Sequence, residues 1–387
     1  MPGAEISGQA IGAASCPHRP PCPGCPRFGE RGIAAAARAA LDELADRHGL
    51  PKTAVISGHL SGFRLRARLA IRGRVGSPKL GLFEPGTHRV VHVPHCRVQH
   101  PLINRVASVV RRVLVDTRTS SYSDKARLGF ARYLQVVVER RSQTAQVVIV
   151  ANSPTAQAPA ACMELIRERL GNELHSLWFN RNCGTSNSIL GADFQRWCGA
   201  ASVAERFGGA TVHYPPGAFG QNNLEIAEAV IQHVREQIPQ GAGVAEFYAG
   251  VGAIGLSVLA RAGEVRMNEV SPQSLQGLEL GLAGLEAADR ARVSVVPGPA
   301  GAMCEAAAGM QVVIADPPRK GLDAGLTDYL LAHPPPRFVY VSCGLESLLS
   351  DTERLTARGG LRLAALTAFN LMPFTTHVET VARFDRV

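Results

Sequence analysis

The sequence predicts an α/β protein that combines a doubly wound parallel sheet with a preceding α+β domain. Three observations lead to this prediction. Apolar strands alternate with helix-forming stretches from about residue 221 onward. Residues 57–151 instead alternate apolar and polar side chains with period two, which is typical of half-buried, mostly antiparallel strands. The length of 387 residues exceeds one ordinary core and fits two domains.

The N-terminal region combines an irregular start, a cysteine-rich segment and one helix. Residues 1–15 are small and polar without periodicity, so we expect them to be mobile. A dense Cys/Pro segment follows at residues 16–26, and the alanine-rich run at 33–48 predicts a helix that Gly49 and Pro51 end. The expected units are residues 1–51 with the Cys-cluster segment and helix, 52–205 as the α+β central domain, and 206–387 as the sheet domain.

The central domain is expected to contain several strands and one helix. Its clearest strand covers residues 64–72, where arginines alternate with apolar residues. The arginines are Arg64, Arg66, Arg68 and Arg72. We expect them to form a basic face, which either follows a phosphate backbone or is an ordinary solvated face. Further strands are expected at 90–93, 133–139 and 145–151, and a helix near 158–170.

Charge and composition restrict the partners and the compartment. The net charge of +9 favours an acidic partner, of which nucleic acid is the commonest and membrane phospholipid the rival. The chain has no run of eighteen apolar residues and no N-terminal pattern of a signal peptide, so we expect a cytoplasmic protein without membrane association. Nine cysteines, an odd number in such a chain, favour metal-binding or catalytic roles over a disulfide framework.

A glycine-rich turn marks the expected ligand site of the sheet domain. Strands are expected at 244–248, 264–270, 293–296, 312–315 and 338–342, and helices at 253–262 and 272–285. Gly250 and Gly252 lie between the first strand and its helix, where missing side chains let a nucleotide-type cofactor approach the backbone. Glu269 ends the second strand, where an acid would accept hydrogen bonds from ribose hydroxyls. This spacing fits nicotinamide dinucleotides as well as S-adenosylmethionine.

Four motifs decide between these cofactors. Asp316-Pro317-Pro318-Arg319 ends a strand and makes a rigid polar lip beside the cofactor position. The sequences DPPRKGLD at 316–323, YVSCG at 340–344, GQNN at 220–223 and THVETV at 376–381 together resemble the RNA 5-methyluridine (uracil-C5) methyltransferase family. The resemblance implies a Rossmann-like class I methyltransferase domain, an RNA-binding central domain, and S-adenosyl-L-methionine as cofactor.

The chemistry of uracil gives the cysteine of the second motif a role. C5 of uracil attacks a methyl group only after a nucleophile has added to C6, and a thiolate is the usual adduct former. Cys343 directly follows an apolar strand at the expected cofactor edge. The resemblance implies that Glu379 accepts the C5 proton afterwards. It also implies contacts with S-adenosylmethionine at Gln221, Tyr248, Glu269 and Asp316, beside Gly250 and Gly252 of the glycine-rich turn, and Asp316 has the alternative of touching the uracil edge.

Several positions depart from the usual family pattern. Gly344 stands where asparagine commonly follows the nucleophile, and Asn370 stands where aspartate is common. Glu246 replaces the more usual aspartate of the cofactor strand. The stretch after Val296 offers no obvious acid for the adenine. These departures bear on substrate identity and rate more than on the fold.

The N-terminal cysteines form a second candidate site. Cys16, Cys22 and Cys25 have the spacing C-x5-C-x2-C, and Cys96 supplies a distant fourth thiolate. Four cysteines can hold a zinc ion or a [4Fe-4S] cluster. The spacing resembles the iron-sulfur branch of the family, which favours the cluster over zinc. We expect a structural role that ties the N-terminal segment to the central domain.

The RNA substrate is expected from the overall plan of the chain. Many relatives carry an extra RNA-binding barrel, whereas the cysteines begin here at residue 16, so we expect that this module is absent. Relatives with this plan methylate a loop uridine of 23S ribosomal RNA; transfer RNA is the alternative. Two other classes stay open: a non-catalytic RNA-binding protein and a nicotinamide-dependent dehydrogenase. No obligate protein partner is indicated.

Overall fold

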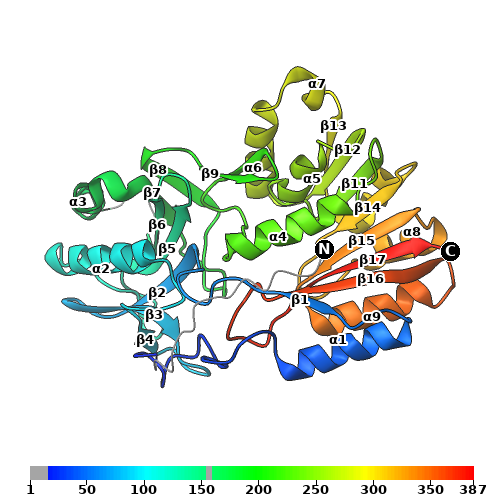
Figure 1. Ribbon diagram of the computed structural model, residues 1–387. Helices are drawn as coiled ribbons and strands as arrows, with labels where there is room; N and C mark the ends of the chain where they lie inside the picture. Colours follow the sequence, from blue (N-terminus) through cyan, green and yellow to red (C-terminus); the bar gives the residue numbers. More distant parts are fainter. Residues whose placement is uncertain (1–15, 154–158) are drawn as a thin grey trace.

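The computed structural model describes residues 16–153 and 159–387. The expectation for residues 1–15 therefore lies outside the described residues. Two large sheets dominate the described part, one in each half of the chain (Figure 1). A small antiparallel ribbon of β9 (Val203–Phe207) and β10 (Ala210–Tyr214) joins them, and β10 packs on the helices of the second half.

The first large sheet has seven strands in the order β4-β3-β2-β5-β6-β7-β8. Their bounds are β2 (Arg66–Arg74), β3 (Ser77–Phe83), β4 (Val90–His92), β5 (Ala131–Glu139), β6 (Thr144–Ala151), β7 (Leu174–Arg181) and β8 (Asp193–Gly199). The pair β6–β7 is parallel and the other recorded pairs of this sheet are antiparallel, which confirms a mostly antiparallel α+β region. Two helices, α2 (Pro101–Asp116) and α3 (Ala160–Leu170), cover one face (Figure 1).

The prediction that the arginines of the strand at 64–72 form an exposed basic face is wrong for two of them. Arg66 and Arg72 are buried, with 7% and 6% of their surface exposed. Arg66 donates from Nη1 to the carbonyl oxygen of Ala218 at 2.9 Å, and Arg72 binds both carboxylate oxygens of Asp124 at 2.6 and 3.0 Å. Period two shows which side chains share a face, but it does not show whether another segment covers that face.

The second large sheet has eight strands in the order β1-β16-β17-β15-β14-β11-β12-β13. The bounds are β1 (Ala54–Ile56), β11 (Gly243–Phe247), β12 (Glu264–Glu269), β13 (Val293–Pro297), β14 (Val312–Ala315), β15 (Arg337–Ser342), β16 (Leu361–Phe369) and β17 (Glu379–Arg386). Strands β11 to β15 are parallel, and β17 is antiparallel to both of its neighbours. The predicted parallel sheet is confirmed, with an antiparallel strand added at one side.

Helices cover both faces of this sheet (Figure 1). They are α1 (Ala35–Arg47), α4 (Leu224–Glu236), α5 (Ala253–Val258), α6 (Pro272–Ala283), α8 (Ala324–Ala332) and α9 (Leu345–Thr356). The four-residue helix α7 (Ala287–Arg290) has no buried residue, and short 3-10 turns lie at Gly171–Glu173, Ala300–Ala302 and Cys304–Ala307. Leu41 and Leu44 of α1 share an apolar cluster with Phe338 and Phe384 of the sheet. Both α1 and β1 thus pack on the second sheet although they precede the first; the boundaries at 51 and 205 stay predictions.

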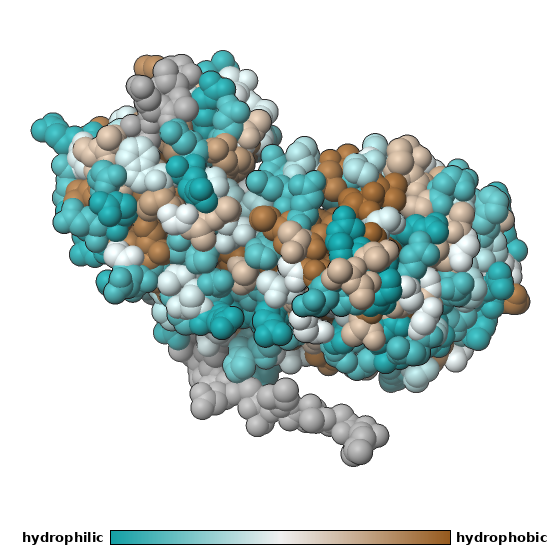
Figure 2. Space-filling model, turned by 90° about the horizontal axis from the view of Figure 1, so that it is seen from above, coloured by the Kyte–Doolittle hydropathy of each residue, from teal (hydrophilic) through white to brown (hydrophobic). Residues whose placement is uncertain are grey.

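Few large apolar side chains are exposed on the surface of the described residues. The face shown in Figure 2 is mainly hydrophilic, and its hydrophobic residues form small separate groups. Phe219 and Val270, 67% and 59% exposed, are among the exposed large hydrophobic residues, and both border the pocket described below. Within residues 16–153 and 159–387, no helix has the length and apolar character needed to cross a membrane.

Candidate active site

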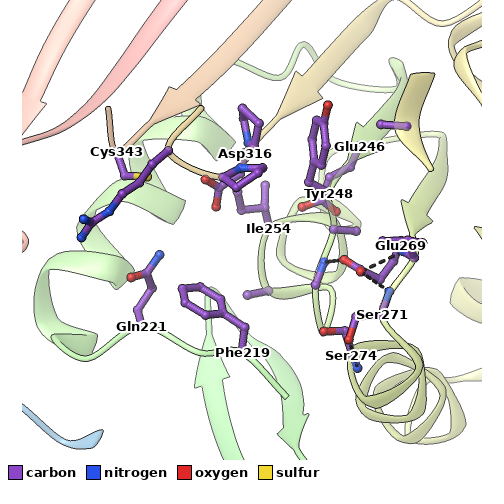
Figure 3. Close-up of a pocket in the computed structure, with 18 of the residues that line it drawn as sticks. Phe219, Gln221, Glu246, Tyr248, Ile254, Glu269, Ser271, Ser274, Asp316 and Cys343 are labelled. Atoms are coloured by element: carbon purple, nitrogen blue, oxygen red, sulfur yellow. Dashed lines mark hydrogen bonds between the residues drawn. The ribbon is translucent and has the colours of Figure 1, made fainter. Parts of the chain in front are cut away.

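A pocket of about 920 Å³ lies at the carboxyl ends of the central parallel strands (Figure 3). Strand β11 has β12 on one side and β14 on the other. The strand order therefore reverses at β11, and the pocket lies at this point. In open α/β sheets this crevice is the usual ligand position. The lining includes seven of the eight residues for which the sequence predicted catalytic or cofactor roles: Gln221, Tyr248, Gly250, Glu269, Asp316, Cys343 and Glu379.

The turn after β11 follows a left-handed path that glycine permits. Gly250 and Gly252 have φ values of 59° and 80°. A Cβ atom at Gly250 would meet nothing within 4 Å, so this backbone faces open pocket space. A Cβ atom at Gly252 would lie 2.5 Å from the side chain of Leu278. Gly250 therefore leaves room for a ligand, whereas Gly252 lets α5 pack closely against α6.

Glu269 fixes the position of this turn relative to β12. Its Oε2 accepts a hydrogen bond from the Gly250 amide at 2.7 Å (Figure 3). Its Oε1 accepts from the amides of Val270 and Ser271 at 2.8 and 2.6 Å. A carboxylate has about four acceptor sites, so three backbone bonds leave capacity for a ligand hydroxyl. The predicted ribose contact is compatible with this arrangement.

Glu246 lies in β11 with an unusual environment for a carboxyl group. The residue is 2% exposed, and its Oε2 has no hydrogen-bond partner in the described structure. Burial, followed by the nearby charge of Asp316, raises the pKa of Glu246 well above its usual value. A Cβ atom at Gly255 would lie 2.3 Å from this Oε2. The glycine therefore makes room for glutamate where relatives commonly have aspartate.

Replacing Glu246 by glutamine is expected to stabilise the protein in a pH-dependent way. The raised pKa means that the wild type loses stability as pH rises above 4.5, the ordinary pKa of a glutamate carboxyl, because the unfolded carboxyl ionises and the folded one resists ionisation. The gain should reach about 1–3 kcal/mol in the free energy of unfolding near pH 8 and shrink near pH 5. Urea unfolding at both pH values measures it, and an equal gain at both would contradict the assigned cause.

Cys343 and Glu379 come together because their strands are neighbours. Ser342, the last residue of β15, pairs with Thr380 of β17, so the next position along β15 lies opposite Glu379. Thr380 donates from Oγ1 to the Ser342 carbonyl at 3.2 Å and fixes this register. Asp316 follows β14, the other neighbour of β15. The sheet therefore gathers a thiol and two carboxyl groups at one end of the pocket.

The charges of these three groups influence one another. Burial, then Glu379 and Asp316, raises the pKa of Cys343 to about 11, and the Arg319 guanidinium opposes this. Burial raises the pKa of Asp316 to about 7. Burial and the charge of Asp316 raise the pKa of Glu379 well above its usual value. The thiol is thus protonated at neutral pH in the free protein, and a cationic ligand would favour the ionised form of all three groups.

Other side chains of the pocket were not given roles from the sequence. Phe219, Arg319 and His377 line it together with the predicted residues. Figure 3 shows Phe219 and Gln221 across the pocket from Cys343 and Asp316. Phe219 precedes Gln221 by two positions, and His377 precedes Glu379 by two. In extended backbone such neighbours share a face, so the spacing itself could have indicated both residues.

Of two departures from the family pattern, Gly344 and Asn370, the first has a local structural reason. A Cβ atom at Gly344 would lie 2.6 Å from the Arg319 carbonyl oxygen, so only glycine fits while the 316–323 loop passes this close. Asn370 is 2% exposed and donates its backbone amide to the Ile56 carbonyl at 2.8 Å. Asn370 lies outside the set of residues that line the pocket. Its side-chain Nδ2 is buried without a hydrogen-bond partner in the described structure, and nothing there explains asparagine at this position.

The four N-terminal cysteines border one small cavity of about 50 Å³: Cys16, Cys22, Cys25 and Cys96. All four are free thiols. Burial, followed by the charge of Cys96, raises the pKa of Cys25 to about 11. Their chemistry suits zinc or iron. However, over the described ranges no group of three or more His, Cys, Asp or Glu side chains is arranged to hold a metal ion, so the predicted metal site is not confirmed.

Comparisons with known proteins agree with this geometry. The sequence model of the tRNA (Uracil-5-)-methyltransferase family matches residues 305–386. A protein of Protochlamydia amoebophila, described as an uncharacterized RNA methyltransferase, is 32% identical over 98% of this chain and 99% of its own. Another, from Geobacter sulfurreducens, is 28% identical over 83% of this chain and 65% of its own.

The fold has a solved counterpart. The crystal structure of Pyrococcus abyssi tRNA (uracil-54, C5)-methyltransferase in complex with S-adenosyl-L-homocysteine matches with a TM-score of 0.76 at 21% identity, covering 96% of this chain and 87% of that one. The described architecture is therefore that of a Rossmann-like methyltransferase. With the full-length relative and the matched family model, the chain belongs to the RNA (uracil-5-)-methyltransferase family.

Proposed function

We propose that this enzyme transfers a methyl group from S-adenosylmethionine to C5 of a uridine in RNA, with Cys343 as nucleophile and Glu379 as proton acceptor. The observation that carries the proposal is the register of β15 and β17, which sets Cys343 opposite Glu379 at one end of the pocket. The other end holds the Gly250 turn and Glu269, where a nucleotide would bind. One pocket thus combines a cofactor end and a reactive end.

The proposed reaction uses the thiol and the carboxylate in sequence. The Cys343 thiolate bonds to C6, and the electrons of the C5–C6 double bond become an enolate that takes the methyl group. When bound, S-adenosylmethionine supplies this methyl on a sulfonium and leaves as the neutral thioether S-adenosylhomocysteine. Glu379 then takes the proton from C5, the C5–C6 double bond re-forms, and the bond from C6 to sulfur breaks to release the thiolate.

Charge supports the timing of these steps. In the free protein, burial and neighbouring carboxyl groups hold the pKa of Cys343 near 11. A sulfonium cation beside Asp316 would favour the carboxylates and the thiolate together, and Arg319 already acts in this direction on Cys343 and Glu379. The nucleophile would thus be activated when the methyl donor is present.

The contacts proposed for S-adenosylmethionine involve Gln221, Tyr248, Gly250, Glu269 and Asp316, all of which line the pocket. Tyr248 has a φ of 61° and accepts a hydrogen bond at its hydroxyl from the Asp323 amide at 3.0 Å. This bond holds the ring at the pocket edge. Gly252, predicted as a further contact, would act through helix packing. Asp316 has the alternative of contacting the uracil edge.

The proposed substrate is a loop uridine of 23S ribosomal RNA, with transfer RNA as the alternative. The net charge of +9 supports an RNA partner, and the resemblance of the cysteine spacing to the iron-sulfur branch of the family favours ribosomal RNA. Mass spectrometry of nucleosides tests both, using ribosomal and transfer RNA from cells without 5-methyluridine. New 5-methyluridine in ribosomal RNA would support the first proposal. New 5-methyluridine in transfer RNA alone would make transfer RNA the substrate. The absence of 5-methyluridine from both RNAs would refute uridine C5 methylation.

The four cysteines are proposed to hold a structural [4Fe-4S] cluster, with zinc as the alternative. Cys22→Ser is expected to lose most of the bound iron and sulfide, because a hydroxyl is a poor replacement for a thiolate ligand. Iron and sulfide analysis of protein purified without oxygen measures this. Cys183→Ser is the matched control, since Cys183 is an exposed free cysteine away from that cavity. A wild type that contains zinc and no iron would contradict the cluster.

A further inference from the structure

The loop between β16 and β17, residues 370–378, carries one wall of the reactive end. Leu371, Met372, His377 and Val378 line the pocket, and Glu379 follows directly. Residues 370–378 form neither helix nor strand, so the path of the loop depends on contacts with other parts of the chain. Two of them come from neighbouring elements: Asn223 donates from Nδ2 to the Leu371 carbonyl at 3.2 Å, and Arg64 approaches the Met372 sulfur at 4.0 Å.

Phe374, in the middle of this loop, has a strained backbone. Its φ is 66°, in the left-handed region that bulky residues avoid. The residue is nevertheless 2% exposed, so the strain is combined with nearly complete burial. Strained conformations of this kind persist only where the surroundings enforce them, and they gather at functional sites. The contacts around Phe374 therefore bear on the geometry of the pocket.

Those contacts come from the N-terminal segment, almost the whole chain length away. The Arg27 amide donates to the Phe374 carbonyl at 2.9 Å, and Arg27 Nη1 donates to the Thr375 carbonyl at 3.1 Å. The ring of Phe28 packs on that of Phe374 with centroids 5.0 Å apart. Phe63 and Val98 belong to the same small apolar cluster, against which Leu60, Cys25 and Cys96 also pack, and the cluster is separate from both large cores.

Phe374 is connected to the pocket residues by a tight turn that its neighbour Thr375 stabilises. Thr375 donates from Oγ1 to the Met372 carbonyl at 2.7 Å, and the His377 amide donates to that Oγ1 at 3.2 Å. Met372 and His377, which both line the pocket, are thus fixed relative to Phe374 on either side. A shift of Phe374 would move both side chains and the start of β17.

From this we infer that Arg27 and Phe28 are positioning residues: they hold Phe374 in its strained conformation and so set the 370–378 loop and Glu379 for catalysis. The inference rests on the proposed function. It predicts that loss of the Phe28 ring impairs the chemical step and leaves the cofactor end intact, because Gly250 lies in the turn after β11 and Glu269 at the end of β12. A misplacement of about 1 Å at a reacting group can cost roughly 100-fold in rate.

Phe28→Ala in the full chain tests the inference. We expect kcat for uridine methylation to fall by roughly 10- to 100-fold, the Kd for S-adenosylhomocysteine to stay the same, and amide exchange across residues 370–378 to become faster. Phe28→Tyr, which keeps the ring, should restore all three. Phe130→Ala is the matched control, because it removes a half-buried ring stacked on Phe179 in the other sheet. It should leave kcat and loop exchange unchanged.

The outcomes separate this inference from the proposed function. Unchanged kcat and loop exchange in Phe28→Ala would overturn the positioning role, as would an equal loss of kcat in Phe130→Ala. If the wild type methylates no uridine, the proposed function fails, and the exchange of residues 370–378 alone decides whether Phe28 holds the loop. Should Phe28→Ala not fold, Phe28→Leu is measured in the same way with the same criteria.

Discussion

Cys343→Ala is expected to abolish methylation, with kcat reduced by roughly 10⁴-fold or more. Without the thiol nothing adds to C6, so C5 stays too weak a nucleophile to take the methyl group. The fold should persist, because the change removes one half-buried sulfur at the end of β15. Single-turnover assays with labelled S-adenosylmethionine measure the rate, and S-adenosylhomocysteine binding reports on the cofactor end.

The control for this variant is Cys198→Ala, which removes another partly exposed free thiol, from β8 of the first sheet. It should keep the wild-type rate and a similar melting temperature. Methylation by Cys343→Ala at more than a small fraction of the wild-type rate would exclude a covalent role for this cysteine. The thiol would then contribute packing alone.

The Glu379→Gln variant is expected to transfer the methyl group to the uridine and then to stall before releasing the RNA. The amide cannot take the C5 proton, so the methylated RNA should stay bonded to Cys343 and turnover should fall by roughly 10²- to 10⁴-fold. A covalent protein–RNA species on a denaturing gel, formed with natural uridine, is the expected result. The same change removes a neighbour that raises the pKa of Cys343, so alkylation of this thiol near neutral pH should become faster.

The alkylation measurement gives this prediction a second readout that needs no RNA. Glu353→Gln on α9 provides the matched control, because Glu353 is an exposed residue outside the pocket. It should change neither turnover nor the alkylation rate of Cys343. Normal turnover by Glu379→Gln would mean that another group, or water, takes the proton.

Much of the second sheet could be predicted because its local signals agree with its tertiary structure. Buried parallel strands are continuous apolar runs, as in VVIA at 312–315 and FVYVS at 338–342, and the turn after β11 needs glycine at Gly250. The pairing of β15 with β17 could not be read from the sequence, since register depends on both strands. That pairing is what brings Cys343 and Glu379 together.

The first sheet shows where local patterns mislead. Alternating arginines suggested a solvent-facing basic surface, yet Arg66 and Arg72 are buried. Arg72 pairs with Asp124, 52 positions away, and lies over the rings of Phe83, Tyr122 and Tyr133. A charged residue becomes internal only through partners distant in the sequence, and periodicity contains no information about them.

The residues of the site that lie in sequence motifs could be predicted, whereas the features that depend on tertiary packing could not. Motif residues that line the pocket, such as Asp316 and Cys343, follow directly after strands whose ends meet at one edge. The unpartnered Oε2 atom of Glu246 and the strain at Phe374 were not expected, because both arise from close packing, by Gly255 and by the N-terminal segment. Packing of this kind is specified only once the chain has folded.

The central claim, a covalent bond between Cys343 and C6 of a uridine, is tested most directly with RNA that contains 5-fluorouridine. Fluorine at C5 cannot be removed as a proton, so the methylated adduct is trapped. Mass spectrometry after protease and nuclease digestion should find the peptide containing Cys343 joined to methylated 5-fluorouridine, in the wild type and only with S-adenosylmethionine present. Methylation of ordinary RNA by the same preparation, with no adduct on Cys343 from the fluorinated RNA, would contradict the claim.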